Sequence, residues 1–172
     1  MRHEPHPFWR FSLRTYRLPG VEAALLALQD DAGTDTNLLL WCAWLAVDGR
    51  SLDKRTLRRA MAGVARWQSE VILPLRRARR SLKTAPPSQQ GGWADELRQR
   101  IGAVELDMEY VEQRALFELA QALPQAARAV PPREAAQASI ARYLGLLGAV
   151  VTPGVERRVG VLIEACLPAV PP

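Results

Sequence analysis

The chain has 172 residues, of which 48% are hydrophobic and 24% charged, which suits one globular domain with a buried core. Its longest apolar run, 38–47, is too short to cross a membrane, and two isolated cysteines exclude a disulfide framework and favour a cytoplasmic location. The net charge of +5 is compatible with a nucleic-acid partner, but 21 of the 23 basic residues are arginine, a skew that GC-rich codons also produce.

The N-terminal part predicts three helices. The first begins at Pro7, because proline lacks a backbone N–H group and fits the first turn of a helix. The second ends at Gly33, a typical residue beyond a helix C-terminus. The third follows a cap at Thr34 or Asp35 and is apolar on nearly every side, so we expect it at the centre of the fold. If Asn37 is buried there, it needs hydrogen-bond partners, for which the first helix is a candidate.

Two long helices follow, over residues 54–83 and 93–123, and each has core-facing positions at alternating steps of four and three. These positions are Leu57, Met61, Val64, Gln68, Val71, Leu75, Ala78 and Leu82 in the first, and Leu97, Ile101, Val104, Met108, Val111 and Ala115 in the second, with Leu119 and Leu123 after them. The first helix has ten basic residues against one acidic, and the second has seven acidic against three basic. We therefore predict an antiparallel hairpin packed through these two seams. Ser51 or Asp53 is expected to cap the N-terminus of the first, basic helix. Pro74 predicts a kink or a break near residues 70–73.

Two further helices begin at prolines 131–132 and 153, after a loop over 84–92 that separates the long helices. No segment shows the alternating pattern of an exposed strand. The sequence thus predicts an all-α, single-domain bundle of about seven helices over residues 1–172, with the long hairpin at its centre and a C-terminal helical pair in 124–172.

The strongest surface feature is a basic pole at the end of the first long helix. It consists of Arg76, Arg77, Arg79, Arg80 and Lys83. We predict that this pole binds a partner, together with Trp93 at the start of the next helix. An antiparallel hairpin would bring Arg98 and Arg100 to the same end, and Trp9 is a second aromatic candidate. The alternative is a solvated helix end, because the helix dipole favours cations there.

Catalytic and metal-binding patterns are weak. The acidic run of Glu105, Asp107, Glu109 and Glu112 has no nearby histidine, so ion pairs with the basic helix are favoured over a metal site. The arginines expected in those pairs are Arg55, Arg58, Arg59 and Arg66. His3 and His6 lie in a leader that we expect to be mobile, and Cys42 reads as a core residue. We therefore expect neither an enzyme nor a cofactor or metal site.

Several segments resemble, in the same order, an uncharacterised and mainly proteobacterial all-helical family known only as a domain of unknown function. They are 8–13 (FWRFSL), Tyr16, 19–21 (PGV), 28–30 (LQD), 35–45 (DTNLLLWCAWL), Trp67, Val71, 74–76 (PLR), Arg79, Arg80, Leu82 and Lys83. The resemblance makes 8–123 the family-like core and implies a small cytosolic helical protein of bacteria. It implies no catalytic or binding residue.

Two functions fit these observations. The first is a non-enzymatic interaction or adaptor protein that binds a protein partner through a face bearing tryptophan or arginine. The alternative is a basic RNA- or ribosome-associated factor that acts through the pole at 76–83, for which binding would fall steeply with salt. Neither function requires a membrane.

Overall fold

A computed structural model describes residues 5–83, 92–124 and 130–167, and these ranges are helical throughout apart from short connections. The elements are α1 (Pro7–Tyr16), α2 (Val21–Ala32), α3 (Thr36–Ala46), α4 (Lys54–Trp67), the π-helical turn η1 (Gln68–Ile72), α5 (Leu73–Lys83), α6 (Gly92–Gln121), α7 (Pro132–Leu147) and α8 (Pro153–Cys166). Because α4, η1 and α5 form one continuous segment, these elements make seven helices. The predicted all-α bundle of about seven helices is confirmed. Most of the predicted 84–92 loop lies outside the described residues.

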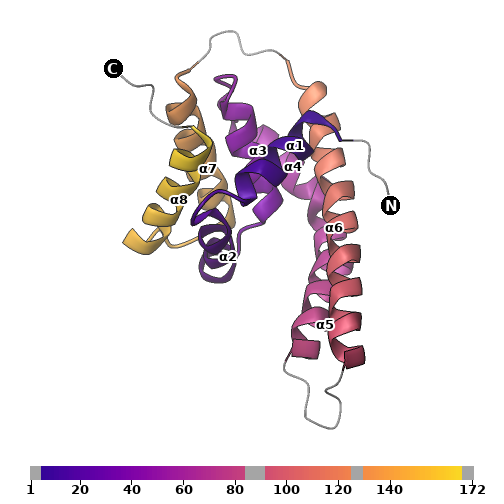
Figure 1. Cartoon of the computed structure of the whole chain (residues 1–172). Coiled ribbons are helices and arrows are strands. Elements are labelled where there is room, and N and C mark those ends of the chain that lie inside the picture. Colours follow the sequence, from indigo (N-terminus) through magenta and orange to yellow (C-terminus); the bar gives the residue numbers. More distant parts are fainter. Residues whose placement is uncertain (1–4, 84–91, 125–129, 168–172) are drawn as a thin grey trace.

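Helix α3 lies at the centre, as its composition predicts, and ten of its eleven residues are buried. Its neighbours include α1, α7 and the upper half of α6, while α8 packs mainly along α2 (Figure 1). The C-terminal pair therefore closes the bundle against α2 and α3. Leucines dominate this core, with Phe8, Trp41 and Tyr143 as its largest aromatic side chains.

The predicted helix ends agree with the structure in most cases. Asp35, one of two candidates, caps α3 by accepting the N–H of Asn37 at 2.8 Å, and Asp53 caps α4 in the same way through Thr56 at 2.7 Å. Gly33 ends α2 with a φ of 63°, a conformation that residues with a Cβ rarely adopt.

The expectation of a mobile leader is wrong for His6, whereas His3 lies outside the described residues. His6 Nδ1 accepts the backbone N–H of Trp9 at 3.1 Å, and its ring stacks on Phe117 with centroids 4.8 Å apart. The histidine therefore caps α1 and joins that helix to α6, which gives it a structural role.

The kink predicted by Pro74 takes the form of the π-helical turn η1, which ends two residues before the proline. Proline cannot donate the bond that an α-helix requires, and its ring collides with the carbonyl one turn earlier. The wider π turn relieves both problems without ending the helix. It also turns Gln68 toward α3 and α6, where its amide contacts Asp35 and Glu112.

The hairpin is antiparallel, because later residues of α4 and α5 contact earlier residues of α6. Trp67 Nε1 donates to the carbonyl oxygen of Met108 at 3.0 Å, while Arg79, twelve residues on, pairs with Glu105. Helix α5 and the N-terminal half of α6 extend away from the rest of the molecule as a two-helix arm (Figure 1).

The predicted seam of α6 is wrong in register. Leu97, Val104 and Val111 are exposed, Val104 to 43%, although they were expected at the centre of the hairpin. The buried residues of α6 are instead Ala94, Glu105, Tyr110, Glu112, Gln113, Leu116 and Ala120. The seam of the basic helix is correct at Leu57 and Val64, but no residue of α5 is buried. Polar contacts decide which face of α6 turns inward, and the spacing of apolar residues in the sequence does not reveal such contacts.

Candidate functional site

The structure divides the basic pole into two groups. Arg77, Arg80 and Lys83 are exposed and make no ion pair with another described residue. Arg76 and Arg79 turn toward α6 and bind its carboxylates. The five residues of the pole therefore do not form one uniformly exposed surface, since Arg76 and Arg79 join α5 to α6, and their binding of a partner stays a prediction.

The inward pair supplies most of the polar contact between α5 and α6. Arg76 donates to Glu109 at 2.5 Å and also to the side-chain oxygen of Gln29 on α2, and its side chain is only 12% exposed. Arg79 Nε donates to both oxygens of Glu105, at 2.8 and 3.0 Å. This hydrogen bond to Glu105 raises the pKa of Arg79, so the guanidinium stays charged.

Other expected pairings change as well. Of the acidic run, Glu105 and Glu109 bind arginines of α5 instead of those of α4, and Arg66 pairs within its own segment with Glu70. Arg98 and Arg100 pair locally with Asp95 and Glu96. The cause is the π turn together with the register of the hairpin, because α5, and not α4, faces Glu105 and Glu109.

The two aromatic candidates differ in exposure. Trp93 is 52% exposed at the start of α6, so its side chain is accessible, and its binding of a partner stays a prediction. Trp9 is buried and makes an edge-to-face contact with Tyr110, with ring centroids 5.2 Å apart, so it cannot serve as an exposed anchor. Trp9 contributes instead to the wall of a pocket.

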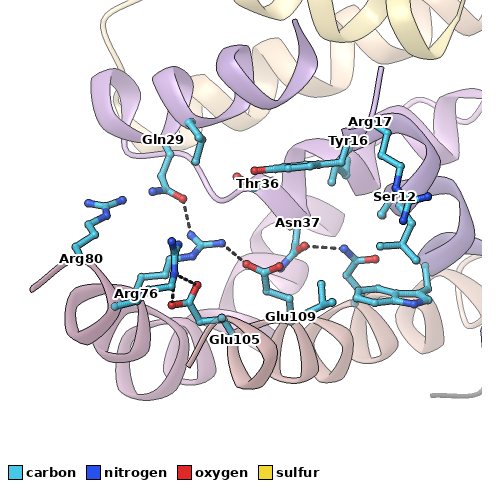
Figure 2. Close-up of a pocket in the computed structure, with 18 residues that line it drawn as sticks. Ser12, Tyr16, Arg17, Gln29, Thr36, Asn37, Arg76, Arg80, Glu105 and Glu109 are labelled. Atoms are coloured by element: carbon cyan, nitrogen blue, oxygen red, sulfur yellow. Dashed lines mark hydrogen bonds and ion pairs between the residues drawn. The ribbon is translucent and has the colours of Figure 1, made fainter. Parts of the chain in front are cut away.

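This pocket lies between the two-helix arm and the rest of the molecule, here called the body, and has a volume of about 360 Å³ (Figure 2). Its lining comes from α1, α2, α3, α5 and α6, so it depends on the packing of the whole N-terminal region. The apolar part of its lining consists of Trp9, Leu13, Leu26, Leu40 and Leu106. A volume of this order is typical of ligand-binding sites, and most of the residues that line this pocket are polar or charged.

The pocket has an excess of positive charge. Four arginines line it, namely Arg17, Arg76, Arg79 and Arg80, against the two carboxylates of Glu105 and Glu109. The difference is +2, and Arg76 and Arg79 are the ones already bound to glutamates. Arg17 and Arg80 are exposed and form no ion pair with any described residue, so the unmatched charge sits at the rim. An anionic group entering the pocket would find complementary charge there.

Three buried polar atoms at the pocket also lack partners. Ser12, Asn37 and Gln113 line it and are each 2–3% exposed, yet Ser12 Oγ, Asn37 Nδ2 and Gln113 Oε1 form no hydrogen bond with any described residue. Buried polar groups are nearly always satisfied, so these three atoms are candidates for hydrogen bonds to a polar group that enters the pocket.

A polar network lies behind the pocket, where α3, η1, α6 and α7 meet. Asp35 Oδ2 accepts from Gln68 Nε2 at 2.7 Å, and the backbone N–H of Asp35 donates to the hydroxyl of Tyr143 at 2.9 Å. Glu112, 1% exposed, faces Asp35 in this network. Burial first, and then the charge of Asp35, raises the pKa of Glu112 to about 10, so Glu112 is protonated at neutral pH.

Asn37 joins this network to the pocket. Its Oδ1 accepts from Gln113 Nε2 at 2.8 Å, so the partner of Asn37 comes from α6 and not from α1 as expected. Gln113 lines the pocket, as does Asn37, which Figure 2 labels. A change at Glu112 would therefore reach the pocket lining through neighbouring side chains.

Groups that often carry chemistry are not activated here. Burial raises the pKa of Cys42 to about 12, and burial with nearby Glu22 and Glu109 raises the pKa of Tyr16 to about 12, so both stay neutral. In the described ranges no three His, Cys, Asp or Glu side chains are grouped so that they could hold a metal ion. Among the described helices, none has the length and apolar character needed to cross a membrane.

Sequence reasoning did not identify the pocket or the buried network. The usable signals were Gln68, the single polar member of an otherwise apolar seam, and the polar Asp35 and Asn37 at the start of the most apolar helix. No periodicity indicated that Glu112 and Gln113 turn inward, because both follow the exposed Val111 of the predicted seam.

The segments on which the family resemblance rests converge on this site. They contribute the pocket residues Trp9, Ser12, Leu13, Tyr16, Gln29, Thr36, Asn37, Leu40, Arg76, Arg79 and Arg80. A family model described as "Protein of unknown function (DUF2390)" matches residues 7–116, which include every pocket residue. No curated protein and no solved structure matches the chain. The chain belongs to this DUF2390 family of proteins of unknown function.

Proposed function

We propose that this is a non-enzymatic interaction protein of the bacterial cytoplasm, and that it binds a protein partner at the pocket between the body and the arm. One observation carries the proposal: a half-open pocket with unmatched positive charge at its rim lies where the family-like segments meet. Exposed Leu26 and Leu106 beside the rim arginines give it the mixed apolar and charged character of a protein-binding surface.

The pole contributes to this proposal in two ways. Arg76 and Arg79 hold the arm in place and so shape the pocket wall. Arg80 lines the rim, whereas Arg77, Lys83 and Trp93 are exposed on the arm outside the pocket, so binding at the pocket does not require them. Proteins recognise acidic segments by such clusters of cations beside apolar contacts.

The test compares two charge reversals of equal size. Arg17→Glu with Arg80→Glu removes both rim cations, and Arg58→Glu with Arg77→Glu removes two exposed cations that do not line the pocket. We expect the partner recovered from native lysate, quantified by mass spectrometry, to fall about tenfold or more with the first pair and little with the second. Equal losses would show that the pocket is not the binding site.

The alternative is an RNA- or ribosome-associated factor. It is favoured by the exposed arginines of α4 and α5, including Arg55, Arg58, Arg59 and Arg77, which make no ion pair with other described residues. For this function the Arg58 and Arg77 reversals would be the damaging ones, recovery would fall on nuclease treatment, and binding would weaken steeply with salt. The two functions therefore give opposite outcomes in the same experiment.

A further inference from the structure

We propose that the occupant of the pocket is a short acidic stretch of the partner, in which an apolar residue lies between two acidic residues. This inference rests on the interaction function proposed above and specifies the chemistry of the partner. It follows from how charge, apolar surface and unsatisfied polar groups are distributed over the pocket.

The two unmatched cations lie apart. Arg80 and Arg17 stand at opposite sides of the pocket, with Arg76 between them (Figure 2). Arg76 is occupied by Glu109 and Gln29, so it has little capacity for a further anion. A single carboxylate would satisfy one rim arginine and leave the other unmatched. A short segment with a carboxylate near each end satisfies both.

The middle of the segment meets apolar surface. Leu26 on α2 and Leu106 on α6 both line the pocket and are exposed, and they come from the two structures that the pocket separates, the body and the arm. An apolar side chain of the partner would cover both leucines. This contact is favourable because it removes apolar surface from water. A purely polar diacid would leave this surface in water.

The charge of the wall favours carboxylates over phosphates. Glu105 and Glu109 line the same pocket, so a dianionic phosphate would approach two carboxylates as well as the arginines. The net charge of +2 matches two singly charged carboxylates. The orphaned groups of Ser12 and Gln113 suit the main-chain amides of a peptide, which offer both donors and acceptors.

The probe is the tripeptide N-acetyl-Glu-Leu-Glu-amide, titrated into the 15N-labelled full chain and followed by 1H–15N NMR. We expect shifts of the Trp9 indole and of backbone amides around the pocket, with an affinity on the order of 1 mM. N-acetyl-Gln-Leu-Gln-amide should bind about tenfold more weakly, and N-acetyl-Glu-Ser-Glu-amide several-fold more weakly. Adipate and adenosine monophosphate test a free diacid and a nucleotide.

Substitutions of the two rim arginines test whether the tripeptide binds at this pocket. Arg17→Gln and Arg80→Gln should each weaken tripeptide binding several-fold, while the control Arg77→Gln, on the same helix as Arg80 but outside the pocket, should leave it unchanged. Retained dispersion of the spectra shows that each variant is folded. The proposal is overturned if the glutamine peptide binds equally well, if adipate or the nucleotide binds as tightly as the tripeptide, or if Arg77→Gln weakens binding equally.

The outcome can be separated from that of the proposed function. A partner whose recovery depends on Arg17 and Arg80, without any preference for the acidic tripeptide, would overturn only the acidic occupant. Tripeptide binding with no partner lost on reversal of these arginines would overturn the interaction function at this pocket.

Discussion

Helices α3 and α5 are both eleven residues long, but they are held in the fold by different forces. Ten residues of α3 are buried, most of them apolar, whereas α5 buries none of its residues. Helix α5 instead keeps its position through packing on α6 and through the pairs Arg76–Glu109 and Arg79–Glu105. Burial in the core fixes α3, whereas packing on α6 together with ion pairs fixes α5.

The difference explains why the pocket lies where it does. On its α3 side the wall is continuous with the apolar core, so its shape is fixed by close packing. On its α5 side the wall is built from ion pairs, which can exchange partners at less cost than a core can be repacked. A binding site between a rigid wall and an adjustable one can admit a ligand without disturbing the fold.

The largest effect should come from truncating α3. Leu39 is fully buried, so Leu39→Ala should lower the free energy of unfolding by about 3–4 kcal/mol, since it removes apolar contacts and leaves a cavity. The matched change in α5, Leu75→Ala, removes a half-buried side chain and should cost about 1 kcal/mol. Urea denaturation followed by circular dichroism measures both. Equal losses would show that the arm is packed as tightly as the body.

The same contrast decides how much of the fold could be predicted from sequence. Apolar side chains on nearly every side of α3 predicted its central position, because burial of this helix follows mainly from side-chain hydrophobicity. Proline and glycine predicted the helix ends and an irregularity before Pro74, which the structure forms as a π turn, since backbone geometry is local to those residues. Both kinds of information are carried by short stretches of chain.

The register of α6 and the pocket could not be obtained in this way. Val104 and Glu105 are neighbours, and periodicity selects the valine for burial, yet the glutamate turns inward because Arg79 lies opposite. That partner is 26 residues away and is positioned by the π turn. Contacts of this kind depend on tertiary structure, so a prediction from local pattern favours the wrong face.

A smaller effect, with an unusual pH dependence, is expected for Glu112→Gln. The pKa of Glu112 is raised from its ordinary 4.5 to about 10, so between these values the folded protein holds a proton that the unfolded chain releases. Stability of the wild type therefore falls as pH rises, by up to about 1.4 kcal/mol per pH unit. The neutral amide has no such dependence. We expect the variant to gain about 1–3 kcal/mol relative to wild type between pH 6 and pH 8.

Thermal unfolding at several pH values measures this difference. Glu118→Gln, at an exposed carboxylate paired with Arg114, is the control and should track the wild type across the same range. A constant difference between Glu112→Gln and wild type would mean that Glu112 is ionised in the folded protein. The network with Asp35 would then have to accommodate two charges.

The smallest of these effects tests how much the ion pairs of α5 contribute to the free energy of unfolding. Arg79→Ala leaves the buried carboxylate of Glu105 without its arginine, and because Arg79 itself is 40% exposed, we expect a loss of about 1 kcal/mol. Adding Glu105→Gln should recover part of this loss, because the unpaired charge is removed. The exposed pair of Arg66 with Glu70 is the control, and Arg66→Ala should cost less than about 0.5 kcal/mol. If Arg79→Ala costs no more than Arg66→Ala, the ion pairs do not hold α5 and its packing on α6 alone must do so.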